Sequence, residues 1–99
     1  MNEPFREPQL IRRRVIYHGR VQGVGFRYTT VSIARRFPVT GYVKNLPKGT
    51  VELVVEGCSE NLDAFVAEVS ERFARNIELA DCEEAAPEGR FSKFGIRYF

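Results

Sequence analysis

The sequence predicts an α+β fold in which two helices cover one face of an antiparallel sheet. Two segments with helical periodicity alternate with strand-like segments, in the order strand, helix, strand, strand, helix, strand, with a short extra strand at the end. The 99 residues, 43% of them hydrophobic, suffice for one modest core and are too few for a two-domain enzyme. Eight Phe, four Tyr and a charged fraction of 28% are typical of a globular chain and not of a disordered one.

The first strand is predicted over residues 11–18, because this run ends in β-branched and aromatic side chains and stops at Gly19. A helix of about three turns follows it. Its buried face should carry the side chains that recur at helical spacing, namely Phe26, Thr30, Ile33, Ala34 and Phe37. Pro38 then prevents the helix from continuing.

Two further strands are predicted over residues 39–46 and 50–56. They are separated by Pro47, Lys48 and Gly49, a short connection in which Pro and Gly suit a hairpin. The two strands should therefore pair antiparallel.

A second amphipathic helix begins near Ser59, which we expect to cap it, with Glu60 in the first turn. Its apolar face belongs to the core and consists of Leu62, Phe65, Val66, Val69 and Phe73. The last two strands are predicted over residues 77–84 and 91–99. In the final strand Phe94, Ile96 and Tyr98 share one face, and Lys93 and Arg97 share the other.

This order of elements, β-α-β-β-α-β with a short extra strand, is the split βαβ pattern of the ferredoxin-like fold. In that topology the first and second strands run the same way with the third between them, so the loop after the first strand and the end of the second share one edge. We assign residues 10–99 to a single domain. Residues 1–9, with two Pro, three charges and no periodicity, are interpreted as a loose arm.

The net charge of +2 conceals an asymmetry between the two halves of the chain. Residues 1–50 hold ten Lys and Arg against two Glu, whereas residues 51–99 hold five against eleven Asp and Glu. A basic half favours an anionic partner, and an acidic half argues against a surface built for a long polyanion. The charge pattern therefore favours a small anion over nucleic acid.

Cysteine and histidine are too scarce for a disulfide framework or a zinc site. Cys58 and Cys82 are expected to be free thiols, although the sequence alone leaves a disulfide open. With one His in the chain no zinc site of the usual spacing can be written, and we expect no metal and no cofactor. No apolar run approaches the ~20 residues of a membrane span, and the first residues lack an apolar signal segment, so a cytoplasmic protein without membrane contact is expected.

The segment Gly19-Arg20-Val21-Gln22-Gly23-Val24-Gly25-Phe26-Arg27 joins the first strand to the first helix. Its three Gly let the backbone turn tightly, so that consecutive amides of the segment can converge on one point at a helix N-terminus, which favours an anion. The positive charge of Arg27 in the first turn of the helix opposes the helix dipole, at a cost of roughly 0.3 to 1 kcal/mol. An anion bound between the helix end and Arg27 would explain why an arginine stands there. Its planar fork suits a phosphate.

The alternative is a plain Gly-rich turn with a solvated Arg. The segment is neither a P-loop nor a dinucleotide-binding fingerprint, because it lacks the third Gly and the Gly-Lys-Ser/Thr.

Three blocks of the sequence together resemble the signature of the acylphosphatase family. They are Gly19 to Arg27, Gly41-Tyr42-Val43-Lys44-Asn45 and Gly49-Thr50-Val51-Glu52, in the family's order and spacing, over roughly residues 12–57. The resemblance implies a metal-free hydrolase that splits the carboxyl–phosphate bond of small acyl phosphates into carboxylate and inorganic phosphate. It also implies that Arg27 and the amides of about Gln22 to Gly25 bind the phosphoryl group, and that Asn45 positions the attacking water.

The chain departs from the family pattern at three places. Lys48-Gly49 stands where the family usually has Asp-Gly, Phe37-Pro38 where it often has Leu-Gly, and Ala74-Arg75-Asn76-Ile77 where it has a Gly-Pro segment. The residues that differ leave all three blocks intact.

Several residues near these blocks have simpler interpretations. Asn45 could bond its own backbone at a strand end. His18, next to the loop, is interpreted as a satisfied side chain and not a general base. Arg12-Arg13-Arg14 and Arg35-Arg36 are interpreted as solvated faces and not as binding patches.

Two other functions remain as alternatives. An RNA-recognition domain shares this topology but needs an aromatic pattern on the central strands that is missing here. A non-catalytic module that binds acyl or carbamoyl phosphate would keep the anion site without turnover. The expectation is therefore a monomeric enzyme whose partners are an acyl phosphate and inorganic phosphate.

Overall fold

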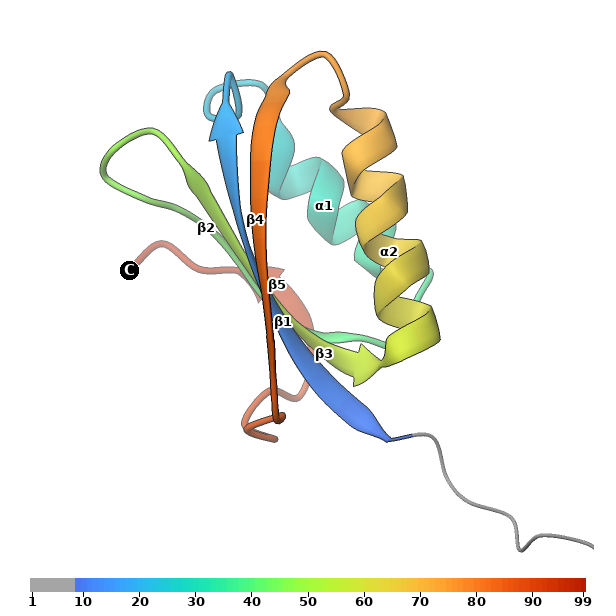
Figure 1. The fold of residues 1–99 in the computed structure, drawn as a ribbon. Helices are drawn as coiled ribbons and strands as arrows, with labels where there is room; N and C mark the ends of the chain where they lie inside the picture. Colours follow the sequence, from blue (N-terminus) through green and yellow to red (C-terminus); the bar gives the residue numbers. More distant parts are fainter. Residues whose placement is uncertain (1–8) are drawn as a thin grey trace, which may run out of the picture.

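The structure is a computed structural model that describes residues 9–99. Figure 1 shows two helices packed side by side against one face of a five-stranded sheet. The elements along the chain are β1 (Leu10–Gly19), α1 (Phe26–Ala34), β2 (Thr40–Asn45), β3 (Val51–Cys58), α2 (Ser59–Arg72), β4 (Ile77–Ala85) and β5 (Phe94–Ile96). The predicted α+β, ferredoxin-like fold is confirmed.

The strand order β4-β1-β3-β2-β5 is the one that the split βαβ pattern predicts for its first four strands. β3 lies between β1 and β2 and pairs antiparallel with each, so β1 and β2 run in the same direction. The loop that follows β1 and the end of β2 consequently lie at the same end of the sheet, the upper end in Figure 1.

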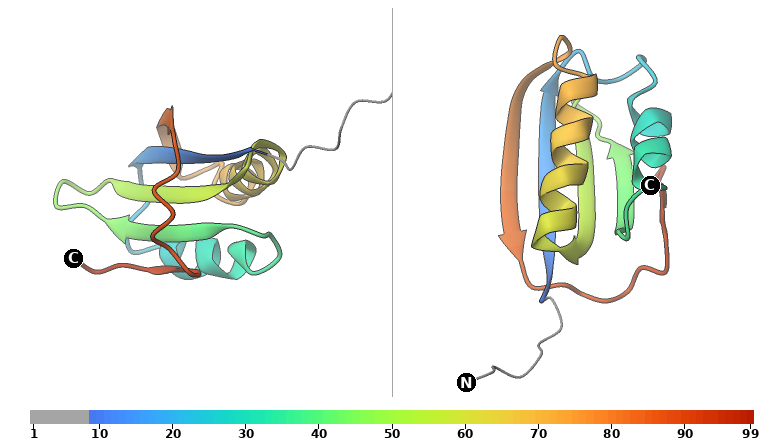
Figure 2. Two further views of the ribbon diagram at one scale, coloured as in Figure 1. Left: turned by 90° about the horizontal axis from the view of Figure 1, so that it is seen from below. Right: turned by 90° about the vertical axis from the view of Figure 1, so that its right-hand side faces the viewer.

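The last strand differs from the prediction in length and in direction. β5 has only three residues, and it pairs parallel to β2, so the sheet is mixed and not wholly antiparallel. Figure 2 shows the reason: after β4, at one edge, the chain crosses the lower end of the sheet to the opposite edge and there turns upward beside β2. Tyr98, expected to share one face of the strand with Phe94 and Ile96, lies beyond the strand and is exposed.

Both helices differ from the prediction at one end. α1 ends at Ala34 and not at Phe37, because the Arg36 and Phe37 amides donate to the carbonyls of Ile33 and Ala34 in a tight turn before Pro38. Phe37 still packs, with its ring 5.9 Å from that of Phe65.

The expected N-terminal cap of α2 is wrong. Ser59 is the first helical residue, Cys58 occupies the cap position, and no side chain caps the helix. The Ser59 hydroxyl instead accepts a hydrogen bond of 3.5 Å from Arg13.

The core lies between the sheet and the two helices, and it fixes where α1 begins. Phe26, 2% exposed, lies 5.1 Å from the ring of Tyr17 on β1 and stacks 4.5 Å from Phe73 after α2. Burial of such a ring stabilises the fold by about 1.5–3 kcal/mol. This anchor holds the first turn of α1, and hence the neighbouring Arg27, at the end of β1.

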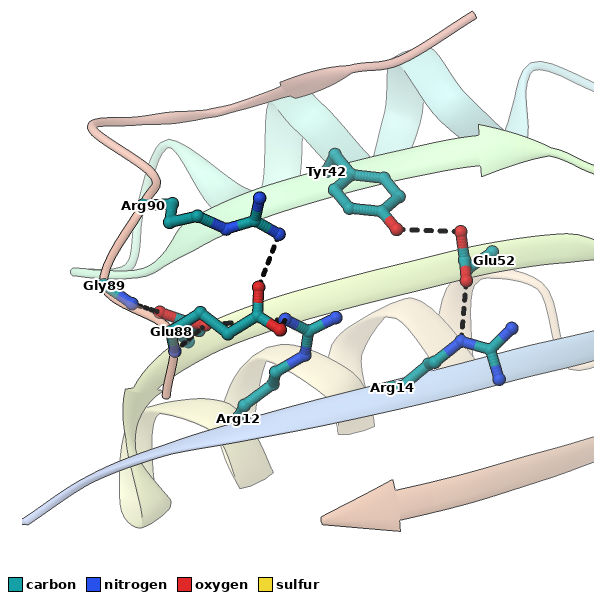
Figure 3. Close-up of polar contacts among 8 residues, drawn as sticks. Arg12, Arg14, Tyr42, Glu52, Glu88, Gly89 and Arg90 are labelled. Carbon is teal, nitrogen blue, oxygen red and sulfur yellow. Dashed lines mark hydrogen bonds and ion pairs between the residues drawn. The ribbon is translucent and has the colours of Figure 1, made fainter. Parts of the chain in front are cut away.

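The connection between β4 and β5 is tied to the sheet by charged groups. The buried carboxylate of Glu56 accepts hydrogen bonds from the amides of Glu88 (2.8 Å) and Gly89 (3.1 Å). The Glu88 carboxylate lies 2.8 Å from the Arg12 guanidinium and also binds Arg90 (Figure 3). These contacts hold the crossing chain and therefore the start of β5.

Cys58 and Cys82 are free, as expected. Within residues 9–99 neither helix is long and apolar enough to cross a membrane. The arm expected at residues 1–9 falls, except for Gln9, outside the described residues.

Candidate functional site

The loop between β1 and α1 has the backbone that its glycines predict. Gly23 and Gly25 take φ values of 76° and 81°, in the left-handed region where any side chain would be strained. Gly25 is the cap residue of α1, and α1 has neither a side-chain cap nor an acidic residue in its first turn. Among the hydrogen bonds of the described residues, none is donated by the amides of residues 22–25. Such a helix start attracts an anion.

A cavity of about 210 Å³ opens beside this loop. Its lining joins the loop and the start of α1 to the end of β2: Val21, Gly23, Gly25, Phe26, Arg27, Tyr28 and Asn45. Of the predicted site residues, Gly23, Gly25, Arg27 and Asn45 therefore meet at one cavity, whereas Gln22 and Val24 lie on the loop but not in the lining. This convergence follows from the topology, since β1 and β2 end at the same edge of the sheet.

Asn45 ends β2 opposite Val51 of β3. Its Oδ1 atom is buried and has no hydrogen-bond partner among the described residues. Buried polar atoms are normally paired, so an unpaired acceptor on a residue that lines a cavity marks that residue as a candidate partner of a bound water or ligand. That oxygen therefore does not make the local backbone bond that the sequence left open for Asn45.

The side chain of Gln22 has a contact that the sequence did not predict. Its Nε2 donates to the carbonyl of Leu46 at 2.8 Å and to that of Thr50 at 2.9 Å. The two carbonyls belong to the hairpin directly after Asn45, which is itself closed by the Leu46 amide on Thr50 at 2.9 Å. Gln22 thus ties the loop to the hairpin and holds both walls of the cavity in register.

Arg27 is half-buried and forms no ion pair with any carboxylate of residues 9–99. Its guanidinium instead lies over the ring of Tyr98, 5.2 Å from the ring centre. The neighbouring Tyr28 hydroxyl raises the pKa of the Tyr98 phenol. A guanidinium placed over a ring keeps its N–H edge free for the oxygens of an anion such as phosphate.

Sequence reasoning did not include Tyr28 and Tyr98 in the site. Tyr28 directly follows the motif, and an exposed aromatic at that position was a usable signal. Nothing in the local sequence could have placed Tyr98 beside Arg27.

His18 lies away from the cavity, on the face of the sheet that the helices do not cover. Its Nε2 lies 3.1 Å from the carboxylate of Asp81 on β4. The interpretation of His18 as a satisfied side chain is consistent with this contact, whose partner is close only because β1 and β4 are neighbours.

The arginines of β1 are not merely solvated, as the sequence suggested, because each of them pairs with a carboxylate. Arg14 donates to Glu52 at 2.6 Å, which raises the pKa of Arg14, and the Tyr42 hydroxyl donates to the same carboxylate at 2.9 Å (Figure 3). Arg13 pairs with Asp63 and with Glu84. On α1's side of the molecule Arg36 pairs with Glu68, while Arg35 is exposed.

Two larger hollows lie next to the cavity. One, of about 710 Å³, runs between α1 and α2 and includes Tyr28 in its lining. The other, of about 430 Å³, lies beside β5 and includes Tyr98. No group of three or more potential metal ligands is found in residues 9–99.

Comparison with known proteins places this arrangement in a family. The family model described as Acylphosphatase matches residues 13–96. The acylphosphatase of Trichormus variabilis is 52% identical over 60 residues, which are 61% of this chain and 59% of that protein. The acylphosphatase of Bordetella parapertussis is 40% identical over 85 residues, 86% of each chain.

Solved structures agree with these relatives. The acylphosphatase of Bacillus subtilis superposes with a TM-score of 0.79 at 32% identity, covering 89% of this chain and 99% of that one. Full-length HypF, in its phosphate- and nucleotide-bound form, gives 0.79 at 30% identity and covers 93% of this chain but 12% of its own. The same fold therefore occurs both as a small separate chain and as a part of a much longer one.

Proposed function

This chain belongs to the acylphosphatase family, and on that premise we propose that it hydrolyses the carboxyl–phosphate bond of small acyl phosphates, giving a carboxylate and inorganic phosphate. The observation that carries the proposal is the cavity of about 210 Å³ in which Arg27, Asn45 and the glycine loop meet. Arg27, Asn45 and the loop all come from one chain, so a monomer suffices for the reaction.

In the proposed complex the phosphoryl group is bound by Arg27 and by the amides of Gln22 to Gly25. The support is electrostatic: a free guanidinium edge and a helix N-terminus without acidic residues face the same cavity. Both groups also stabilise the charge that spreads over the phosphoryl oxygens in the transition state.

Asn45 is proposed to position the attacking water. Its unpaired Oδ1 can accept a hydrogen bond from that water, whose oxygen lone pair then points at phosphorus. The water oxygen bonds to phosphorus as the bond from phosphorus to the carboxyl oxygen breaks, and the carboxylate leaves with the electron pair. An amide is not a base at pH 7, so the water proton passes to a phosphoryl oxygen. A good leaving group needs little more than this positioning.

A second candidate is a module that binds an acyl or carbamoyl phosphate without hydrolysing it. It is favoured by the match to HypF, where this fold makes up 12% of a longer chain. The two candidates share the phosphate site and differ only in turnover.

The test is phosphate release from benzoyl phosphate, measured with and without EDTA. We expect turnover that survives chelation, because the residues assigned to the reaction include no metal ligand. Binding of inorganic phosphate without any release from the substrate would favour the non-catalytic module. Loss of activity in EDTA, restored by Mg²⁺ or Zn²⁺, would contradict the proposed chemistry.

A further inference from the structure

Exposed aromatic side chains gather at the mouth of the candidate site. Tyr28 is 68% exposed and lines the cavity, and Tyr98 is 60% exposed and lies beneath the Arg27 guanidinium. Single exposed aromatics are ordinary on protein surfaces. Here one of them lines the candidate cavity, and the other lies against the arginine that is proposed to bind the phosphoryl group.

Both rings are tied to the site. The Tyr98 ring carries the Arg27 guanidinium, 5.2 Å from its centre, and Tyr28 lines the cavity directly after Arg27. A ring that is placed before a ligand binds lowers the entropy lost when the ligand packs on it. Tyr28 belongs to α1, a helix anchored in the core by Phe26, so its Cα position relative to the cavity is fixed.

Charge around Tyr28 gives an anionic group no advantage. The hollow that continues from Tyr28 between α1 and α2 is lined by Arg36 and Arg72 and by Glu68 and Glu71, and Arg36 is already paired with Glu68. The nearly buried Ile33, 7% exposed, adds an apolar surface to the same hollow. The two positive and two negative side chains balance, so a neutral, apolar group leaving the cavity in this direction meets no net charge and can pack on the apolar surface.

The second hollow, beside β5, includes Tyr98 and carries positive charges. The hollow beside β5 is lined by Arg90, Lys93 and Arg97, with the Arg97 guanidinium stacked 3.9 Å above the Tyr42 ring. An acyl group with its own carboxylate would gain there and not at Tyr28. An acyl group that packs on Tyr28 should therefore be neutral and apolar, whereas an acyl group that reaches the hollow beside β5 should carry a negative charge.

We propose that Tyr28 and Tyr98 form the acyl subsite of this chain and select acyl phosphates with an aromatic or apolar acyl group over those that carry a carboxylate. The inference rests on the proposed function. Tyr28, which lines both the cavity and the hollow between the helices, is the residue that makes this contact.

The subsite can be tested by binding of phosphonates, which mimic the phosphorylated end of the substrate and cannot be hydrolysed. Calorimetry with benzylphosphonate, methylphosphonate and 3-carboxypropylphosphonate is run on the wild type and on Tyr28→Ala, Tyr28→Phe and Leu79→Ala. We expect the wild type to bind benzylphosphonate about tenfold more tightly than methylphosphonate, the ratio that one aromatic pair of about 1.4 kcal/mol produces.

In Tyr28→Ala that ratio should fall close to one, while the affinity for inorganic phosphate stays the same. Tyr28→Phe keeps the ring and should keep the preference. Leu79→Ala removes another exposed apolar side chain, on β4 and remote from the site, and should change nothing.

Equal affinities of the wild type for benzylphosphonate and methylphosphonate, or a preference that survives Tyr28→Ala, would overturn the subsite. Tightest binding of 3-carboxypropylphosphonate would overturn it in favour of the cationic hollow. Hydrolysis of benzoyl and acetyl phosphate, measured in parallel, tests the proposed function separately. A protein that hydrolyses neither would refute that function, while the phosphonate ratios would still decide whether the rings bind the attached group.

Discussion

At the scale of single residues, Arg27 and Asn45 line the same cavity but are suited to different work. Arg27 offers a positive, planar donor set without a carboxylate partner among residues 9–99, and Asn45 offers one buried acceptor. A guanidinium binds the phosphoryl oxygens, whereas an amide oxygen can only orient a water. Substitutions at the two positions should therefore separate binding from chemistry.

Arg27→Ala should abolish phosphate binding and turnover and leave the fold intact, because the Arg27 side chain is not part of the core cluster. Two charge-assisted hydrogen bonds of about 1.5–3 kcal/mol each correspond to at least a hundredfold loss of affinity. Inorganic phosphate should raise the unfolding temperature of the wild type and not that of the variant. Arg27→Lys, which keeps the charge but not the fork, should give an intermediate result. Equal protection of wild type and Arg27→Ala would remove Arg27 from the site.

Asn45→Ala should bind phosphate nearly as tightly as the wild type and lose about a hundredfold in kcat, because misplacing a nucleophile by ~1 Å costs that much. The variant should not be destabilised through a lost Oδ1 contact, since that atom has no partner among residues 9–99. Asn45→Asp sets a negative charge facing the phosphate and should weaken binding as well. Steady-state hydrolysis and phosphate inhibition in one buffer distinguish these effects. If Asn45→Ala loses phosphate affinity as fully as Arg27→Ala, the role assigned to Asn45 is wrong.

At the scale of elements, the site depends on how the β1–α1 loop is joined to the β2–β3 hairpin. The joint is the Gln22 side chain, whose amide binds the carbonyls of Leu46 and Thr50. Neither contact belongs to a helix or to the strand pairing. Gln22 therefore acts as a positioning residue through its side chain, whatever its backbone amide does for the anion.

Gln22→Ala should lower the free energy of unfolding by about 1–3 kcal/mol, the net value of two hydrogen bonds to buried carbonyls. It should also lower kcat by about tenfold or more, with a smaller change in phosphate affinity, because Arg27 and the loop amides remain. Urea unfolding and steady-state kinetics measure the two effects. Lys48→Ala, an exposed change at the tip of the same hairpin, is the control and should alter neither. A wild-type kcat in Gln22→Ala would show that the loop and the hairpin are held together without this contact.

At the scale of the whole molecule, ion pairs between the two halves of the chain neutralise much of the charge asymmetry of the sequence. Arginines of the basic half pair with carboxylates of the acidic half: Arg12 with Glu88, Arg13 with Asp63 and Glu84, Arg14 with Glu52, and Arg36 with Glu68. These pairs connect β1 to β3, β4, α2 and the crossing chain. The excess positive charge therefore serves the fold as well as any anionic ligand.

The pairing makes stability depend on pH through Glu88. A hydrogen bond to Arg90, assisted by the charge of Arg12, lowers the pKa of Glu88 in the folded protein. The contribution of Glu88 to stability is therefore present above the unfolded pKa of about 4.3 and is lost as pH falls through the lower folded pKa. Wild type should be more stable than Glu88→Gln at pH 7, and their unfolding temperatures should converge as the pH falls below about 4. A difference that persists unchanged at low pH would show that the ionised carboxylate is not involved.

The sequence by itself determined the features that depend on local chemistry. Hydrophobic spacing located both helices and four of the strands to within a few residues, because burial on one face imposes a period of 3.6 or 2. The glycines of the β1–α1 loop predicted a tight turn at a helix start, and Gly23 and Gly25 take there a left-handed backbone that strains other residues. The topology then predicted that Arg27 and Asn45 would meet, and they line one cavity.

Only the tertiary structure decided the contacts between residues that are distant in the chain. The direction of β5, the stacking of Tyr98 under Arg27, the Gln22 bridge and the partners of the β1 arginines all depend on which strands are neighbours. No periodicity encodes them, because each is a single polar or aromatic contact whose geometry exists only after the sheet has formed. The candidate phosphate site is therefore predictable from the sequence motifs and the topology that they imply, whereas the aromatic mouth that we assign to the acyl group is a product of the assembled fold.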